Sequence, residues 1–205
     1  MTVVVVANPK GGVGKSTTAT QVAGYWARQG HRVMLGDVDR QQSSRLWLGL
    51  RPSGARAVGA WTAAPDQVLK PPKGTTHVVL DTPAGLHGKR LTEVVRCADK
   101  VLIPLQPSIF DIYATRDFVD QLLERRQSAR LDIGVVGMRV DARTRAAAQL
   151  EAYVETLGLP VLGYLRDTQN YVQLAARGLS LFDVAPHQVA QDLAQWQPIC
   201  KWLDR

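Results

Sequence analysis

Asn8-Pro9-Lys10-Gly11-Gly12-Val13-Gly14-Lys15-Ser16-Thr17 is the stretch of this 205-residue chain that decides its fold. It follows an apolar run at residues 3–7, which predicts a buried strand, and it opens a helical pattern at 15–29 that stops at Gly30. Glycines between a strand and a helix let backbone N–H groups turn inward towards phosphate oxygens. The alternative is an ordinary glycine-rich turn, but Gly-Lys-Ser at the start of a helix favours a phosphate-binding loop.

Three side chains of this loop have predicted roles in binding a nucleoside triphosphate. Lys15 can reach the β- and γ-phosphates, the hydroxyl of Ser16 can bind Mg²⁺, and Thr17 can reach the α-phosphate. We therefore expect ATP and Mg²⁺ as cofactors. The predicted nucleotide-binding residues of the loop are Lys10, Gly11, Gly12, Val13, Gly14, Lys15, Ser16 and Thr17.

Strand and helix patterns alternate along the rest of the chain. Apolar runs predict further strands at residues 31–37, 77–81, 100–105, 133–138 and 160–163. Helical patterns cover residues 88–97, 112–126, 144–157, 169–176 and 188–203, and Pro198 is expected to break or kink the last. Continuous apolar runs indicate strands that are covered on both faces. The sequence predicts one α/β domain, residues 1–205, with a mostly parallel, twisted sheet and helices on both faces. Residues 50–75 lack periodicity and are interpreted as an elaborated connection.

Composition narrows the class of protein. Cys97 and Cys200 are the only cysteines, which excludes a disulfide framework and a zinc pattern. No signal peptide and no apolar run long enough for a membrane span are evident, so we expect a soluble, cytoplasmic protein. The net charge is +7, and all of it lies in residues 1–115, which hold 14 basic and 7 acidic residues. This surplus attracts polyanions such as DNA, although a solubilising charge is the alternative.

The phosphate loop departs from the common G-x-x-x-x-G-K-[ST] pattern. Pro9 occupies the first glycine position, and an extra lysine, Lys10, follows it. Lys-Gly-Gly-Val-Gly-Lys-Ser-Thr resembles the deviant Walker A loop of the ParA/MinD ATPases. The resemblance implies a Mg-dependent ATPase in which Lys10 crosses a dimer interface to the partner's nucleotide. Charge alone leaves two options for Lys10, a role at its own site or at a second one.

Carboxylates follow two of the predicted strands. Asp37 and Asp39 come after the second strand, and Asp81 ends the third. The carboxyl ends of parallel strands face the crevice in which ligands bind. Phosphoryl transfer needs an acidic residue near Mg²⁺ and a group that orients the attacking water. Helix capping or turn formation is the alternative for these aspartates.

The ParA/MinD resemblance extends to these residues. Asp-x-Asp-x-Gln is similar to the first switch of that family, and Asp-Thr-Pro-Ala-Gly to its Walker B segment. This implies that Asp39 positions water, that Asp81 holds Mg²⁺ together with Ser16, and that Asp37 supports the metal site. The predicted catalytic residues are thus Lys10, Lys15 and Asp39. Arg40 and Ala84 stand where many relatives have proline.

The end of the fifth predicted strand is where relatives contact the base. Met138 and Arg139 occupy it, although the asparagine common in relatives is absent. Similarity continues through the pattern Arg166-x-x-x-x-Tyr171 to about residue 182. The chain starts directly in the first strand, so it resembles the short, ParF-like ParA proteins that lack an operator-binding domain.

That resemblance implies a partitioning or positioning ATPase. ATP would drive a sandwich homodimer that binds nucleoid DNA without sequence preference, and a cargo-bound ParB-like or ParG-like adaptor would trigger hydrolysis. The cargo would be a plasmid, a chromosome or a large cytoplasmic complex. A MinD-like, membrane-cycling regulator of division or flagellar placement is the main alternative. A metabolic enzyme of the same class is a third, but Cys97 lies in no cluster motif.

Two sets of basic residues are candidates for DNA contact. The first, on the elements nearest the end of the chain, consists of Arg139, Arg143, Arg145, Arg166, Arg177 and Arg205. The competing set consists of Lys89, Arg90, Arg96 and Lys100. The terminal segment, with Trp196, Ile199, Trp202 and Leu203, contains Pro198 and only two basic residues. It is expected to pack on the sheet rather than to anchor the chain to a membrane.

Overall fold

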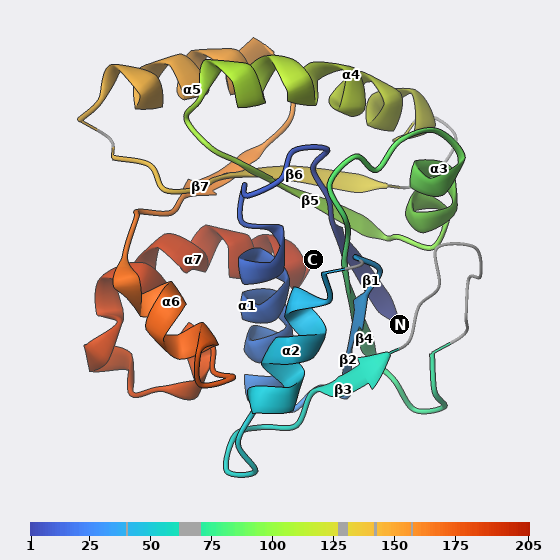
Figure 1. Cartoon of the computed structure of the whole chain (residues 1–205), viewed down its shortest axis with the longest axis vertical. Helices are drawn as coiled ribbons and strands as arrows, with labels where there is room; N and C mark the ends of the chain where they lie inside the picture. Colours follow the sequence, from blue (N-terminus) through green and yellow to red (C-terminus); the bar gives the residue numbers. More distant parts are fainter. Residues whose placement is uncertain (40, 62–70, 127–130, 142, 157) are drawn as a thin grey trace.

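A seven-stranded parallel sheet forms the centre of the molecule (Figure 1). The computed structural model describes residues 1–39, 41–61, 71–126, 131–141, 143–156 and 158–205, and only the backbone of 109–114, 125 and 126. In spatial order the strands are β3 (Gly59–Trp61), β2 (Val33–Asp37), β4 (His77–Asp81), β1 (Thr2–Val6), β5 (Lys100–Leu105), β6 (Asp132–Gly137) and β7 (Val161–Tyr164). Every pair of neighbours is parallel. The predicted α/β fold is confirmed.

Helices cover both faces of this sheet (Figure 1). On one face lie α1 (Lys15–Arg28), α2 (Ser43–Leu50), α6 (Gln169–Ala175) and α7 (Ala190–Leu203). On the other lie α3 (Gly88–Arg96), α4 (Ile109–Arg126) and α5 (Arg145–Thr156). Side chains of β1 alternate between the two apolar clusters, since Val4 and Val6 belong to the first and Val3 and Val5 to the second. This explains why the strands are apolar throughout.

The order of the strands positions the site. The chain leaves β1 through the phosphate loop into α1, and β1 lies between β4 and β5. Connections therefore run in opposite directions from β1, which makes its carboxyl end a topological switch point. Open α/β sheets bind ligands in the crevice at such a point.

One α-helix and one strand were not predicted from the sequence, nor were the short 3-10 helices at residues 181–183 and 186–188. Helix α2 follows the predicted Asp37–Asp39 segment, and the short edge strand β3 lies inside the region interpreted as a connection. Residues 62–70 of that region, and also Arg40, lie outside the described residues.

Pro198 does not break the last helix. Helix α7 runs from Ala190 to Leu203, so of the expected break or kink the break is wrong. The tryptophan and isoleucine on either side of the proline, Trp196 and Ile199, are both 0% exposed in the core. Burying each of them stabilises the helix by about 1.5–3 kcal/mol, which offsets the lost hydrogen bond. The expectation that the terminal apolar residues pack on the sheet is confirmed.

None of the helices in the described part of the chain combines the length and the apolar character needed to cross a bilayer.

Candidate functional site

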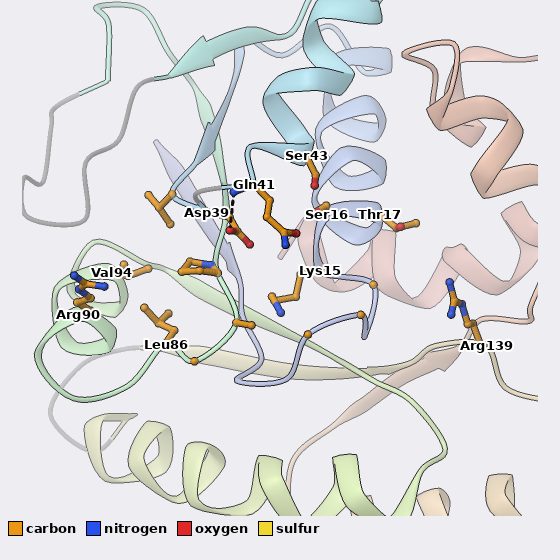
Figure 2. A pocket seen from close by; sticks show the side chains of 17 residues that line it. Lys15, Ser16, Thr17, Asp39, Gln41, Ser43, Leu86, Arg90, Val94 and Arg139 are labelled. Carbon is orange, nitrogen blue, oxygen red and sulfur yellow. Dashed lines mark hydrogen bonds between the residues drawn. The ribbon is translucent and has the colours of Figure 1, made fainter.

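A pocket of about 850 Å³ opens over the phosphate loop at the carboxyl ends of β1, β2 and β4. Figure 2 shows Lys15, Asp39 and Gln41 grouped in its middle, with Arg90 and Leu86 on one side. Arg139 lies at the other side (Figure 2). The residues that line it are Gly11, Gly12, Gly14, Lys15, Ser16, Thr17, Val38, Asp39, Gln41, Ser43, Pro83, Ala84, Gly85, Leu86, Arg90, Val94 and Arg139.

Backbone conformation explains the glycines of the loop. Gly12 and Gly14 have φ angles of 77° and 96°, in the left-handed region that side chains with a Cβ rarely adopt. A Cβ on Gly14 would also come within 2.8 Å of Cε of Met138, which packs beneath the loop. The loop can therefore curl above α1 only with glycine at this position.

Two amide side chains that the sequence reading did not single out hold the loop in place. Asn8 is fully buried, donates to the carbonyl oxygen of Pro104 at 2.9 Å, and accepts from the backbone N–H of Lys10 at 2.8 Å. Gln106 donates to the carbonyl oxygen of Gly12 at 2.9 Å. Both tie the loop to the end of β5. In the sequence, these two residues could have been recognised only by the position of each amide next to the end of a predicted strand.

Lys15 is nearly buried, with 7% of its surface exposed. Its ammonium group donates to the carbonyl oxygen of Lys10 at 2.5 Å, so the side chain lies back across its own loop. Burial lowers the pKa of Lys15, while the negative charges of Asp81 and Asp39 oppose that shift. The loop thus presents a cation that is attracted by two of the predicted site carboxylates, Asp81 and Asp39.

Within the part of the chain that the structure describes, only one carboxylate oxygen of Asp81 accepts a hydrogen bond. It is fully buried, and its Oδ2 accepts a 2.6 Å hydrogen bond from the hydroxyl of Ser44. Its Oδ1 has no hydrogen-bond partner among the described residues. Burial raises the pKa of Asp81 to about 6, against the hydrogen bond from Ser44, the nearby hydroxyl of Ser16 and the charge of Lys15.

This arrangement fits a magnesium ion. A buried, unpaired carboxylate oxygen close to the hydroxyl of Ser16 offers the hard oxygen ligands that Mg²⁺ prefers. The described residues contain no group of three or more histidine, cysteine or carboxylate side chains that could hold a metal by themselves. Mg²⁺ is usually held by one or two protein ligands together with phosphates and water.

Asp37 caps the start of a helix and reaches the predicted metal site only through a second residue. Its carboxylate accepts from the backbone N–H groups of Asp39, Ser44 and Arg45 at 3.0, 2.9 and 3.1 Å. It therefore caps the start of α2, which was the alternative interpretation of this residue. Its connection to the metal site is indirect and runs through Ser44, which it holds against Asp81.

Asp39 lines the pocket, as its predicted role requires. Its Oδ1 accepts from the backbone N–H of Gln41 at 3.0 Å, which fixes a tight turn at the edge of the phosphate site. Figure 2 shows the Asp39 carboxylate directed towards the space above Lys15.

Of the two residues predicted to contact the base, Arg139 lines the pocket and Met138 lies below it. Arg139 lines the pocket and has a φ angle of 53°. Met138 is 4% exposed, packs against Gly14 and accepts from the hydroxyl of Thr18. Its side chain therefore supports the loop, and the expected base contact by Met138 does not agree with this position. Val13, another predicted nucleotide-binding residue, is likewise buried.

Several of the basic residues considered for DNA contact are paired with aspartates. Arg166 donates to Asp192 at 2.6 Å, Arg143 to Asp141 at 2.9 Å, and Arg139 lies 3.8 Å from Asp167. Arg145, Arg177 and Arg205 are exposed.

In the second set of candidate DNA-binding residues, Lys100 is buried. Lys100 is 6% exposed, pairs with Asp132 at 3.2 Å, and lies over the ring of Trp202. It cannot reach DNA, so its inclusion was wrong. Arg90 belongs to the nucleotide pocket, whereas Lys89 and Arg96 are exposed on α3.

Comparisons with known proteins agree with this geometry. The family model described as the CobQ/CobB/MinD/ParA nucleotide binding domain matches residues 4–182. The maintenance of carboxysome distribution protein A of Gloeobacter kilaueensis is 30% identical over 214 residues, covering 99% of this chain and 94% of the relative. The chromosome-partitioning ATPase Soj of Thermus thermophilus is 29% identical over 184 residues, covering 73% and 74%.

A solved structure shares the fold. The ATP complex of a Cyanothece McdA variant superposes with a TM-score of 0.75 at 18% identity, covering 99% of this chain and 95% of the other. At that level of identity the likeness concerns the arrangement of the elements.

Proposed function

Because this chain belongs to the CobQ/CobB/MinD/ParA family of nucleotide-binding domains, we propose that it is a ParA-like ATPase that positions a cargo. The names of its relatives denote two kinds of cargo, a chromosome and a carboxysome. The ATP-bound form would be a homodimer that binds DNA, and a cargo-bound adaptor would stimulate hydrolysis. The proposal places the protein on the nucleoid in the cytoplasm.

The observation that carries this proposal is the position of Asp81, whose Oδ1 has no hydrogen-bond partner among the described residues, beside the curled phosphate loop. Backbone N–H groups of Gly11 to Thr17 and the helix N-terminus would hold the phosphates. Ser16 and Asp81 would hold Mg²⁺, which when bound neutralises charge on the β- and γ-phosphate oxygens.

Hydrolysis would then depend on the remaining charged residues. The ammonium of Lys15 would leave the carbonyl of Lys10 for the terminal phosphates and stabilise the charge that develops there. Asp39, at the pocket edge, would orient the attacking water. Lys10 would act on the nucleotide of the second copy in the dimer.

A MinD-like membrane function is less well supported. Membrane binding by a terminal amphipathic helix needs an exposed apolar face. Four large apolar residues of α7, Trp196, Ile199, Trp202 and Leu203, are at most 3% exposed in the core cluster, and Leu193 is half-buried against it. This helix therefore has no apolar face to offer a bilayer without leaving the sheet.

Two measurements test the proposed function. Release of phosphate from ATP should require Mg²⁺ and stop with excess chelator. Light scattering after gel filtration should show a dimer with a non-hydrolysable ATP analogue and a monomer with ADP. A monomer in every nucleotide state, or turnover that ignores Mg²⁺, would contradict the proposal.

A further inference from the structure

The nucleotide pocket extends beyond the phosphate loop to one side of α3. Arg90 and Val94 of this helix line the pocket together with Leu86, which lies just before the helix. Residues four apart share one side of a helix, so the side of α3 that carries Arg90 and Val94 forms a wall of the pocket. Lys89 and Arg96, on the same helix, do not line it. Arg90 is thus the basic residue of α3 that the fold directs to the nucleotide site.

Buried contacts hold this wall in place beside the phosphate loop. The backbone N–H of Gly85 donates to the carbonyl oxygen of Pro9 at 2.7 Å, which joins the segment before α3 to the loop. Leu86 and Val94 are 3% and 8% exposed and belong to the apolar cluster on this face of the sheet. The backbone of Arg90 therefore has a fixed position relative to the phosphate loop.

The position of Arg90 corresponds to the end of the pocket at which the terminal phosphate is expected. Across the view of Figure 2, Arg139 is followed by Thr17, then by Lys15 and Asp39, and finally by Arg90. Thr17 is expected to bind the α-phosphate and Lys15 the terminal phosphates. A nucleotide bound in this order directs its γ-phosphate towards Asp39 and Arg90, which is the side from which the oriented water attacks.

The guanidinium group of Arg90 is available to a ligand at this end of the pocket. Arg139, at the other end, lies 3.8 Å from the carboxylate of Asp167. Among the described residues, no carboxylate lies within 4 Å of the guanidinium group of Arg90.

The pocket wall around Arg90 is largely apolar. The apolar residues that line this part of the pocket are Val38, Pro83, Leu86 and Val94. A charge interacts more strongly with a phosphate among apolar side chains than in open water, because the local dielectric constant is lower. A bound nucleotide that displaces water from this end of the pocket would therefore strengthen the effect of Arg90.

We propose that Arg90 is a further catalytic residue, whose guanidinium group binds oxygens of the γ-phosphoryl group during hydrolysis. The inference rests on the proposed ATPase activity. The oxygen of water forms a bond to the γ-phosphorus, and the bond between that phosphorus and the oxygen shared with the β-phosphate breaks. One of the two protons of the water passes to a phosphoryl oxygen, which gives ADP and dihydrogen phosphate. Arg90 keeps its protons and stabilises the charge on the oxygens of the transferred group.

Two properties of arginine suit this role. Its planar group of N–H donors can bind two oxygens of one phosphoryl group, and its positive charge persists at physiological pH. Lys15 belongs to the phosphate loop and Arg90 to α3, so the two cations approach the nucleotide from different sides (Figure 2). Both belong to the same chain, and the contribution of Arg90 therefore needs no second copy, in contrast to the proposed role of Lys10.

The test compares Arg90→Gln and Arg90→Lys with two controls on the same helix, Lys89→Gln and Arg96→Gln. All three positions are exposed, so the urea midpoints of the variants should equal that of wild type. Single-turnover hydrolysis of radiolabelled ATP gives the rate of the chemical step. Titration with a non-hydrolysable ATP analogue gives the ground-state affinity, and titration with ADP and aluminium fluoride gives the affinity for a mimic of the group in transfer. Light scattering reports the ATP-induced dimer.

Arg90→Gln should slow the chemical step by about 10²- to 10³-fold, which is the typical effect of removing one donor to a developing charge. Its affinity for ADP with aluminium fluoride should fall by a similar factor, whereas its affinity for the non-hydrolysable analogue should change much less. Arg90→Lys should recover part of the rate, because it keeps the charge but not the paired donors. The controls should hydrolyse ATP at the wild-type rate, and every variant should form the dimer.

An Arg90→Gln rate equal to that of the two controls would overturn the inference. Equal weakening of the analogue and of the aluminium fluoride complex would also overturn it, because Arg90 would then bind the nucleotide uniformly and not the group in transfer. Loss of the dimer in Arg90→Gln would instead assign the side chain to the interface between copies and would overturn the role within one chain. Wild-type protein that does not hydrolyse ATP would contradict the proposed function itself.

Discussion

The hydroxyl group of Ser44 donates a 2.6 Å hydrogen bond to Oδ2 of Asp81, which joins the first turn of α2 to the end of β4. The backbone N–H of the same serine donates to Asp37 at 2.9 Å. Asp37 and Asp81 are also register partners on neighbouring strands. The orientation of the predicted metal ligand is thus set by a residue on a helix that the sequence analysis did not predict.

Replacing Ser44 with alanine should destabilise the nucleotide-free protein by about 1–3 kcal/mol, because it leaves a buried carboxylate oxygen without a donor. Urea unfolding followed by circular dichroism measures this change. Ser43→Ala is the matched control, since Ser43 is exposed and its loss should cost less than about 0.5 kcal/mol. Equal midpoints for the two variants would show that the Ser44–Asp81 bond contributes nothing measurable.

The phosphate loop could be predicted because its information is local. The chain presents in succession a strand, three glycines, Lys15 and Ser16. Each of these features has a role that can be assigned from its neighbours in the sequence. Helix α2 could not be predicted from the sequence, because it is short and contains Gly49 near its end. Its stability comes from tertiary contacts: Asp37 caps it, and Trp47 is buried and donates to the carbonyl oxygen of Leu179.

Ion pairs between segments that are distant in the chain could not be predicted from the sequence either. The charge count treated Arg166 and Lys100 as available to DNA, but Asp192 and Asp132 neutralise them across 26 and 32 residues of chain.

Asp183→Asn should destabilise the protein by about 3–5 kcal/mol, because it removes one partner of a buried ion pair. Arg51 and Asp183 have side chains that are 5% and 4% exposed, and they form two hydrogen bonds of 2.7 and 2.9 Å. Chemical unfolding measures the change. The control is Asp141→Asn in the exposed pair with Arg143, where a loss below about 1 kcal/mol is expected. Similar losses in both variants would show that burial of the pair does not matter.

Stability should fall as the pH drops from about 6.5 to about 4, in part because of His77. Burial first, then the charges of His31 and the N-terminal amino group, lower the pKa of His77 to about 4 in the folded protein, from an ordinary value of 6.5. In that interval the unfolded chain binds a proton that the folded chain does not, so acid favours unfolding. In His77→Phe, which keeps a ring against Trp26, the decrease in urea midpoint between pH 7.5 and pH 5 should be smaller. An unchanged decrease, equal to that of the exposed control His187→Phe, would exclude a contribution from His77.

Asp39→Ala should slow ATP hydrolysis by about two to four decades while nucleotide binding is retained. The reason is that Asp39 lies at the pocket edge, whereas the loop and Lys15 remain intact. Single-turnover hydrolysis and calorimetric titration with a non-hydrolysable analogue measure the two properties separately. Lys15→Ala provides the contrast, because it should abolish binding itself. Full turnover by the Asp39 variant would show that another group orients the water.

Lys10→Ala should separate nucleotide binding from dimerisation. The contact that Lys10 makes with Lys15 uses its backbone carbonyl oxygen, which alanine retains, and its backbone N–H still donates to Asn8. The loop and the Lys15 ammonium should therefore keep their positions, and titration with a non-hydrolysable ATP analogue should give an affinity close to that of wild type. Because the side chain is proposed to act on the nucleotide of the second copy, light scattering should show a monomer with that analogue. Lys89→Ala, which removes an exposed lysine on α3, is the control and should still dimerise. A Lys10→Ala dimer would refute the role across the interface, and loss of nucleotide binding would place the side chain at its own site.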